Sequence, residues 1–505
     1  MFKILVYFSG PSGYTNFAAL QFLQKILPIE IYAINDQSIQ SRKFYEKQKL
    51  LKIKKTWFYR DYSKSFHSPD IKFLKRIEEK YQLNLWHIIT TDPNFFTIND
   101  KSKFTESEIH SLVEDDCKLF KKIIEDVKPD FLILHAGGHK QMNLLREMCR
   151  GSGIRILQFA LAKFGTRYQI SSKHDILDEC YKKIDVSVNK KFSDEYIKKI
   201  EKKLSLSHFQ HENSKSYIKN KILFILGFVQ NFFIVKKESE SLYSNFKKTS
   251  IIKRYFNLLK INLKRIIRKQ FLDNNCVKKI PHNEKFVVFP LHLQPEYTTS
   301  FLAPFFTDQI VLIENIARSL PINYILYVKE HPAMGAFAYW REIEYYKRIL
   351  KIPNVKLIHP NIDSTLIFKN SEMIITINGS ATFEGLMIKK PILVFGDVAE
   401  TITEAVTRIT ELEDLPRTIR NILKVGFKEK GCVRYFEQKM NETIDIVSPE
   451  FDQNLRDILY LKHTEISDIT EQKMKKLLDK NYETYTIIAK EFKRKILQWS
   501  NYKNS

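Results

Sequence analysis

Short apolar runs alternate with segments of helical periodicity in two separate blocks of this 505-residue chain, and this alternation limits the folds open to it more than any other feature. In the first block, the segment Glu106–Val127 has helical spacing of its apolar residues. The apolar runs around it are Lys3–Phe8, Ile29–Ile34, Phe131–Leu134 and Ile154–Leu157. Strands, loops and helices in this order predict right-handed crossovers and a parallel sheet.

The second block begins at Phe286 and has the same character. Its apolar runs, separated by turns or helical segments, are Phe286–Phe289, Tyr324–Val328, Val355–Ile358, Met373–Ile377 and Ile392–Phe395. A chain of this length exceeds one ordinary core, so we expect an α/β fold of two Rossmann-type units that face a cleft. We place these units at residues 1–189 and 280–445, with a basic helical insertion at 190–279 and C-terminal helices at 446–505 that pack back across both.

Cysteine usage and the first residues indicate a cytoplasmic protein. The five cysteines are far apart and form no CxxC pair, which favours reduced thiols over disulfides or a zinc site. The opening MFKILVYFSG enters an apolar strand directly and has no cleavable signal pattern.

Positive charge is concentrated in one stretch of the chain. The formal net charge is +24, and Lys190–Lys279 holds 22 Lys and Arg against 7 Asp and Glu. Such a field attracts anionic lipid, nucleic acid or acidic polymers. Within this stretch, the apolar run Ile222–Val235 is shorter than the ~20 residues of a membrane span. It either lies in the interface of an anionic inner membrane surface or forms a buried helix beneath solvated lysines.

Polar residues follow the strands of the second block, at the sheet edge where open parallel sheets bind ligands. Two prolines hold Gln294 and Glu296 in a rigid loop after Phe286–Phe289. Lys329 and His331 follow Tyr324–Val328, and the proline after His331 keeps it extended. These cations would face a donor phosphate, although a His-Pro pair is also a common turn.

The segment after Met373–Ile377 predicts the start of a phosphate-binding helix. Its residues Asn378, Gly379, Ser380 and Thr382 form a glycine turn that offers free N–H groups and a positive helix end. Glu384, one turn later, would accept hydrogen bonds from two ribose hydroxyls. The alternative is an ordinary helix cap.

The first block contains candidates for the acceptor side. Gly10, Ser12 and Gly13 follow its first strand and either cradle an acceptor or turn the chain. His135 and His139 flank a glycine pair at another strand end, and either one, with an unperturbed pKa of about 6.5, would serve as general base. Histidines in a polar loop are the alternative. Asp92 is a further acceptor-side candidate or a turn former.

Three strings in the second block, FPLHLQPEYTT, YVKEHPAMG and INGSATFEGLMIKKPILVFGD, resemble the capsule polysaccharide biosynthesis protein family, which includes Kdo transferases. The resemblance implies a GT-B fold whose second unit holds the donor without a metal. It implies that His331 and Ser380 contact the donor phosphate, that Glu384 holds the ribose, and that Gln294 and Glu296 lie near the sugar. Thr382 and Gly385 depart from the family pattern at the helix start.

We therefore expect a metal-independent glycosyltransferase without a cofactor. It would move a sugar from a CMP- or UDP-linked donor to a surface polysaccharide or glycolipid acceptor. Glu296, with His135 and His139, completes the predicted catalytic set. A nucleotide-sugar epimerase or hydrolase on the same fold is the first alternative, and a basic nucleic-acid-binding protein is a second, weaker one. Nucleic acid is not expected as a partner, because no RNA- or DNA-binding signature accompanies the charge.

Overall fold

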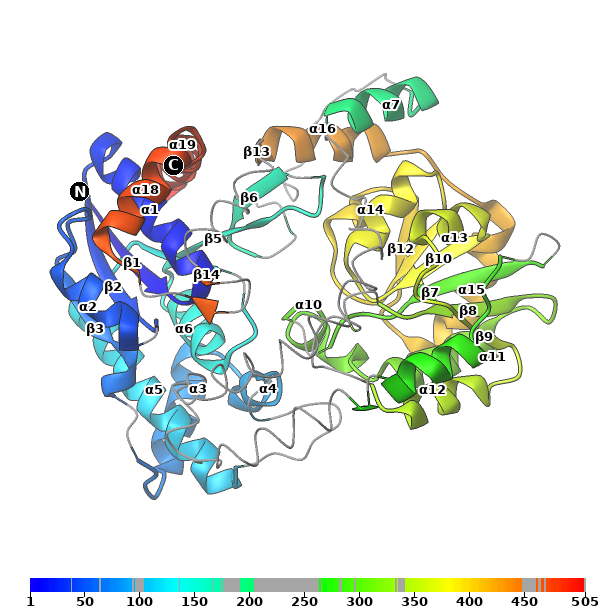
Figure 1. The fold of residues 1–505 in the computed structure, drawn as a ribbon, viewed down its shortest axis with the longest axis horizontal. Helices are drawn as coiled ribbons and strands as arrows, with labels where there is room; N and C mark the ends of the chain where they lie inside the picture. Colours follow the sequence, from blue (N-terminus) through cyan, green and yellow to red (C-terminus); the bar gives the residue numbers. More distant parts are fainter. Residues whose placement is uncertain are drawn as a thin grey trace.

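The computed structural model describes residues 1–37, 39–62, 65–92, 95, 104–135, 137–165, 167–173, 176, 191–203, 263–264, 266–280, 284–294, 297–331, 334, 341–446, 460–461, 465–466 and 469–503. The elements build two α/β units, each around its own sheet (Figure 1). In the described part of the chain, no helix has the length and apolar character of a membrane span.

The first sheet has the strand order β13-β6-β5-β4-β1-β2-β3. Strands β1 to β5 are parallel, whereas β6 runs antiparallel to both of its neighbours. The strands are β1 (Phe2–Phe8), β2 (Ile29–Asn35), β3 (Lys55–Phe58), β4 (Phe131–His135), β5 (Arg155–Leu161), β6 (Arg167–Ser171) and β13 (Thr443–Asp445).

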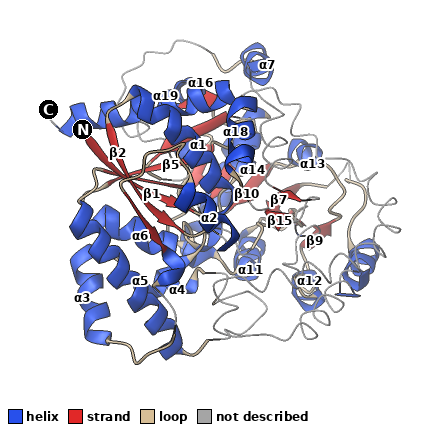
Figure 2. Cartoon of the chain, turned by 60° about the vertical axis from the view of Figure 1, so that its left-hand side comes forward, coloured by secondary structure: helices blue, strands red, loops and turns tan. Residues whose placement is uncertain are grey.

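Helices cover both faces of this sheet (Figure 2). Along β1, Ile4, Val6 and Phe8 belong to one core, and Leu5 and Tyr7 belong to the other, as the alternation of a strand requires. The first core contains residues of α1 (Gly10–Ile26), α2 (Ile39–Lys47), α18 (Glu471–Lys480) and α19 (Tyr482–Lys503). The second contains residues of η1 (Tyr59–Asp61), α3 (Ile71–Tyr81), α4 (Leu85–Thr90), α5 (Glu106–Val127) and α6 (Lys140–Gly151).

The second sheet is entirely parallel and has the order β12-β11-β10-β7-β8-β9. Its strands are β7 (Phe286–Pro290), β8 (Ile325–Lys329), β9 (Val355–Ile358), β10 (Met373–Thr376), β11 (Ile392–Val394) and β12 (Val406–Arg408). The helices and 3-10 turns of this unit are α10 (Tyr297–Ser300), η5 (Pro304–Phe306), α11 (Gln309–Ser319), α12 (Ile343–Leu350), α13 (Ser364–Asn370), α14 (Ser380–Met387), η7 (Ala399–Ile402), η8 (Leu412–Asp414), α15 (Leu415–Val425) and α16 (Cys432–Glu442).

Both sheets have the doubly wound strand order, which confirms the expected GT-B-like pair of Rossmann-type units. In such a sheet, the strand order reverses at one point, and ligands bind there beyond the carboxyl ends of the two strands. The reversal lies between β1 and β4 in the first sheet and between β7 and β10 in the second. The loops that follow these four strands are therefore the positions to examine for a site.

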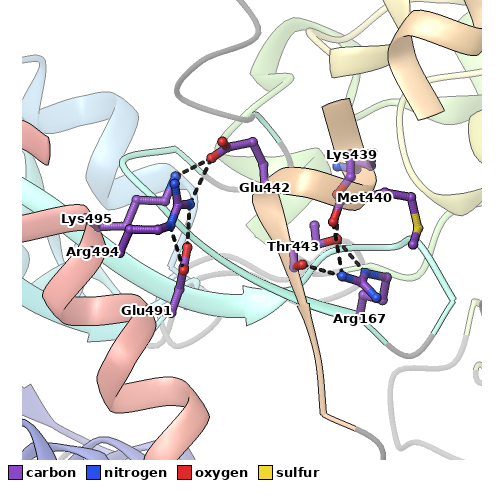
Figure 3. A network of polar contacts seen from close by, with 8 residues as sticks. All are labelled: Arg167, Lys439, Met440, Glu442, Thr443, Glu491, Arg494 and Lys495. Carbon is purple, nitrogen blue, oxygen red and sulfur yellow. Dashed lines mark hydrogen bonds and ion pairs between the residues drawn. The ribbon is translucent and has the colours of Figure 1, made fainter. Parts of the chain in front are cut away.

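The chain returns from the second unit to the first through α16, which leads directly into β13 (Figure 3). Arg167 on β6 donates to Thr443 Oγ1 at 2.7 Å and to the Met440 carbonyl at 3.1 Å, which caps the end of α16. Glu442 accepts from Lys495 Nζ at 2.6 Å and lies 3.3 Å from Arg494. These contacts join the end of α16 to the first sheet and to α19.

Several elements differ from the sequence expectation. The segment Gly10–Gly13, expected as a turn, is the first turn of α1, because Gly13 N donates to Ser9 O at 3.0 Å and Pro11 stands where no backbone donor is needed. Helices α18 and α19, expected across both units, pack in the core of the first. The last three residues of the expected second unit, Thr443–Asp445, pair with the first sheet as β13.

Only parts of the basic insertion are described. Helix α7 (Asp194–Lys203) and residues 266–275 are helical. The run Ile222–Val235 lies outside the described residues. A short hairpin, β14 (Tyr460–Leu461) with β15 (Glu465–Ile466), precedes the C-terminal helices.

Candidate functional site

His292 lies in the loop after β7, at the reversal point of the second sheet. Its Nε2 atom lies 3.2 Å from the backbone N–H of Ile377 and 2.9 Å from Thr376 Oγ1. Burial, followed by the charges of Lys163, His331 and Arg341, lowers the pKa of His292 to about 3, so the imidazole is neutral. Because Nε2 accepts from a backbone N–H, the proton of the neutral ring resides on Nδ1.

The glycine turn after β10 lies against this histidine. Gly379 has φ 106° and ψ −170°, a conformation that only glycine adopts readily, and it precedes the first residue of α14. A Cβ at Gly379 would lie 3.5 Å from Cε1 and 3.8 Å from Nδ1 of His292. No side chain caps the N-terminus of α14. The free N–H groups at the start of α14 and the Nδ1–H of His292 therefore lie close together. Such a group of hydrogen-bond donors at a helix N-terminus suits an anion.

Lys329 and Glu384 lie beside this helix start. Lys329, at the end of β8, is buried, and its Nζ donates to Pro360 O at 3.3 Å. Burial raises the pKa of Glu384 to about 7, whereas a hydrogen bond from Ser380 and the charge of Lys329 favour its ionised form. Burial lowers the pKa of Lys329, whereas the negative charges of nearby carboxylates, including Glu384, raise it. Ser380, Glu384 and Lys329 thus form one polar group.

A buried ion pair supports the loop that carries His331. Arg341 Nη1 donates to Glu330, and Tyr346 donates to the other oxygen of the same carboxylate. Glu330 also accepts from the His331 backbone N–H at 2.6 Å. Arg341 reaches the His292 carbonyl as well, at 2.5 Å. One charged pair therefore fixes the backbone of both histidine loops.

Three predicted donor-side residues hold the loops in place. Gln294 is buried and donates to Thr307 O at 2.6 Å. Asn378 is buried and donates to Thr298 O at 2.6 Å. Thr382 is fully buried, and its hydroxyl donates to Gly379 O at 2.8 Å, so we assign it to the turn and not to ligand contact. Glu296 lies outside the described residues.

In the first unit, His139 and Asp92 come together. His139 Nδ1 lies 3.9 Å from Asp92 Oδ1, and the Lys140 backbone N–H donates to Asp92 Oδ2 at 2.7 Å. Asp92 is fully buried, whereas the side chain of His139 is 49% exposed. The nearby carboxylate of Asp92, together with the charge of Asp36, raises the pKa of His139. Asp36 itself accepts from Tyr7 and Gln141 beside the end of β1.

His135 differs from His139 in its surroundings. Burial, followed by the charge of Arg146, lowers the pKa of His135 to about 4. Arg146 donates to the His135 carbonyl at 3.3 Å and lies 4.9 Å from the ring centroid of Tyr297 in the second unit. A Cβ at Gly138 would lie 3.9 Å from Tyr297 N. The loop after β4 therefore contacts α10, and His135 belongs to that contact more than to an open surface.

The predicted acceptor residues Gly10, Ser12 and Gly13 lie in the first turn of α1. A Cβ at Gly13 would lie 2.4 Å from Gln37 Nε2, which donates to Gly10 O at 2.8 Å. Gly13 is therefore required for close packing of the loop after β2. The structure gives these residues a positioning role at the reversal point of the first sheet.

Sequence reasoning missed several residues of these two clusters. Glu330, Arg341 and Asp36 acquire their roles from contacts with residues that are not their sequence neighbours. Only Glu330 and Asp36 directly follow a strand, and Arg341 has no such signal. His292 is not in the predicted set either, although it stands two residues before Gln294 in the same loop. Across the described ranges, no group of three metal-ligating side chains is found.

A protein-family comparison finds a match in the middle of the chain. Residues 180–403 match the model of a family described as capsule polysaccharide biosynthesis protein. This segment is therefore similar to the capsule polysaccharide biosynthesis family. The match contains all three strings on which the resemblance was based and thereby confirms it. The family segment includes β7 to β11 and therefore the whole cluster around His292 and α14.

Comparison with individual proteins adds little to the family assignment. No curated protein sequence matches the chain. The UDP-GlcNAc 2-epimerase from Neisseria meningitidis is 15% identical over 87% of this chain and 94% of its own, with a TM-score of 0.26. The β-Kdo 2,7 transferase KpsC from Thermosulfurimonas dismutans is 12% identical over 66% and 86%, with a TM-score of 0.28. TM-scores of this size support no inference about activity.

Proposed function

We propose that the chain is a glycosyltransferase that moves a sugar from a nucleotide-sugar donor, CMP- or UDP-linked, to a glycan or glycolipid acceptor. The observation that supports this best is the cluster at the reversal point of the second sheet. There, the uncapped start of α14 meets the Nδ1 side of His292 and the Ser380–Glu384–Lys329 group. The similarity of residues 180–403 to the capsule polysaccharide biosynthesis family agrees with a glycan product.

In this proposal, the start of α14 binds the phosphate of the donor. Backbone N–H groups and the positive helix end stabilise phosphate oxygens, and a neutral His292 adds one donor without carrying a charge. Lys329 and His331 would stabilise the charge that develops on the phosphate as the bond between the sugar and the phosphate breaks. Glu384, with its carboxylate beside Ser380, would accept hydrogen bonds from the ribose hydroxyls.

On the acceptor side, we assign His139 as the general base. Its exposed ring can take the proton of an attacking hydroxyl, while the buried Asp92 stabilises the imidazolium that forms. His135 has a lowered pKa and lies in the contact with α10, which makes it the weaker candidate. The excess of Lys and Arg in Lys190–Lys279 supports contact with an anionic membrane surface that presents a glycolipid.

The proposal is tested by the release of free nucleotide from CMP- and UDP-sugars. We expect release that depends on an added glycan or glycolipid acceptor and that falls by about 100-fold or more in H139A. Release at the same rate without any acceptor would indicate hydrolysis, and conversion of the donor to an isomer would indicate epimerisation. Either outcome would contradict the transferase proposal.

A further inference from the structure

The loop between β5 and β6 extends from the first unit into the core of the second. Its hairpin is closed by a hydrogen bond from Ala162 N to Arg167 O of 2.8 Å. Phe164 in this loop is fully buried. Its ring centroid lies 5.2 Å from that of Phe383 and 5.8 Å from that of Phe436, which belong to α14 and α16. Ala162 and Phe164 are thus part of a core that the second unit forms together with residues of α7 and its approach.

The anchor at Phe164 brings its neighbour Lys163 to the candidate donor site. Phe383 is one residue before Glu384 in the same helix that begins at Ser380. Lys163 directly precedes Phe164, so its backbone lies next to α14, and its charge is among those that lower the pKa of His292. A cation from the first unit therefore lies beside the loop after β7 of the second.

The backbone at Lys163 is held in a conformation that a lysine disfavours. Its φ is 50°, in the left-handed region. In the described ranges, three other non-glycine residues have positive φ, and each one ends a helix, where this conformation is common: Gln82, Lys128 and Lys389. Lys163 lies instead in the loop of the β5–β6 hairpin. Glycine, which occupies the second left-handed position of the same loop at Gly165, would fit with less strain.

Several cations lie around the loop after β7. Lys163, His331 and Arg341 all act on His292. Arg341 is paired with Glu330, and Lys329 is opposed by Glu384 and Asp363. Lys163, with its left-handed backbone conformation and its place near an uncapped helix start, is therefore suited to an anionic ligand.

We propose that Lys163 is a phosphate-binding residue that the first unit contributes to the nucleotide site of the second. The proposal rests on the nucleotide site proposed above and extends it. Because Phe164 is anchored in the second unit, docking of the loop and binding of the phosphate would stabilise each other.

The test is titration calorimetry of the full chain with CMP and UDP. We expect K163M to bind whichever nucleotide the wild type binds about tenfold or more weakly, as for loss of one charge-assisted hydrogen bond. K163R should retain most of the affinity. The matched control is K128M, because Lys128 has the same φ and charge but lies at the end of α5. It should bind like the wild type.

The outcomes separate the two proposals. If the wild type binds the nucleotide and K163M binds equally well, the role of Lys163 is overturned and the nucleotide site stands. If the wild type binds neither nucleotide, the nucleotide site itself is overturned. K163G serves as a second variant, because glycine relieves the backbone. Higher thermal stability with weaker binding would support a lysine retained for the ligand, and unchanged binding would contradict it.

Discussion

His139 Nδ1 lies 3.9 Å from one carboxylate oxygen of Asp92, and the other oxygen accepts a 2.7 Å hydrogen bond from the backbone N–H of Lys140. The carboxylate is thus fixed by the residue that follows the histidine. Asp92 is fully buried and therefore fixed in position, whereas His139 is about half exposed and can be reached by a substrate.

This pair predicts a specific pH dependence. Asp92 raises the pKa of His139, and a general base acts in its deprotonated form, so the rate should rise with pH through that raised pKa. In D92N, the pKa of His139 falls, and the acidic limb of kcat/KM should move to lower pH while kcat drops about tenfold or more. Asparagine can still accept from Lys140. An unshifted acidic limb in D92N would contradict the role of the pair.

Glu384 predicts opposite effects on stability and on binding. Its folded pKa of about 7 lies above the ordinary value of 4.5, so the stability due to the neutral carboxyl is present below about 4.5 and is lost as the pH rises through about 7. At pH 8, E384Q should therefore be more stable than the wild type by about 1–2 kcal/mol, and near pH 4.5 the difference should vanish. Apparent Tm measured against pH checks this.

The same variant should bind the nucleotide more weakly, because an amide accepts fewer hydrogen bonds from a ribose than a carboxylate does. Calorimetry at pH 8 measures this change. If E384Q is more stable than the wild type and binds the nucleotide with the same affinity, Glu384 has no role in nucleotide binding.

The conformation of Gly379 predicts that alanine at this position weakens nucleotide binding, whereas alanine at Gly426 does not. Gly379 and Gly426 both have positive φ and extended ψ, at the start of α14 and at the end of α15. Alanine at either position should cost about 1–3 kcal/mol in backbone strain, measured by denaturant unfolding. Only G379A should weaken nucleotide binding, because only there does the strain distort the phosphate-binding turn. Equal effects of both variants on affinity would contradict this.

The brace between α16 and α19 predicts a large stability effect. The side chains of Lys495 and Glu442 are 5% and 6% exposed, and their charged atoms lie 2.6 Å apart (Figure 3). E442A would leave a buried ammonium without its carboxylate and should destabilise the chain by about 3–5 kcal/mol. The double variant E442L/K495M should recover most of that loss, as measured by thermal unfolding. Failure to recover would show that the cost arises elsewhere.

Most strands could be predicted because strands buried in a parallel sheet are apolar on both faces. The runs that became β1, β7 and β9 illustrate this, and β9 has the predicted bounds Val355–Ile358. The strands that were missed are short and contain polar residues, as in KTWF of β3, RYQIS of β6 and TID of β13. They lie at or next to sheet edges, where one side of the strand needs no apolar neighbour.

The position of a residue directly after a predicted strand indicated that it could belong to the site. The sequence did not indicate which other residues it would contact. Ser380 and Glu384 share a helix, so their proximity follows from local spacing. By contrast, Arg341 supports the loop of His292 across 49 residues, and Lys163 reaches the site only because Phe164 packs in the other unit. Contacts of this kind depend on the docking of elements that are distant in sequence, so local periodicity does not predict them.

The proposed function depends on binding of the nucleotide phosphate by the second unit at the start of α14. A crystal structure of the chain with CMP or UDP would locate the bound phosphate. We expect it within hydrogen-bonding distance of the backbone N–H of Ser380, with Lys329 or His331 beside it. A nucleotide bound at the first sheet, near Gly10–Gly13, or away from α14 altogether would contradict it.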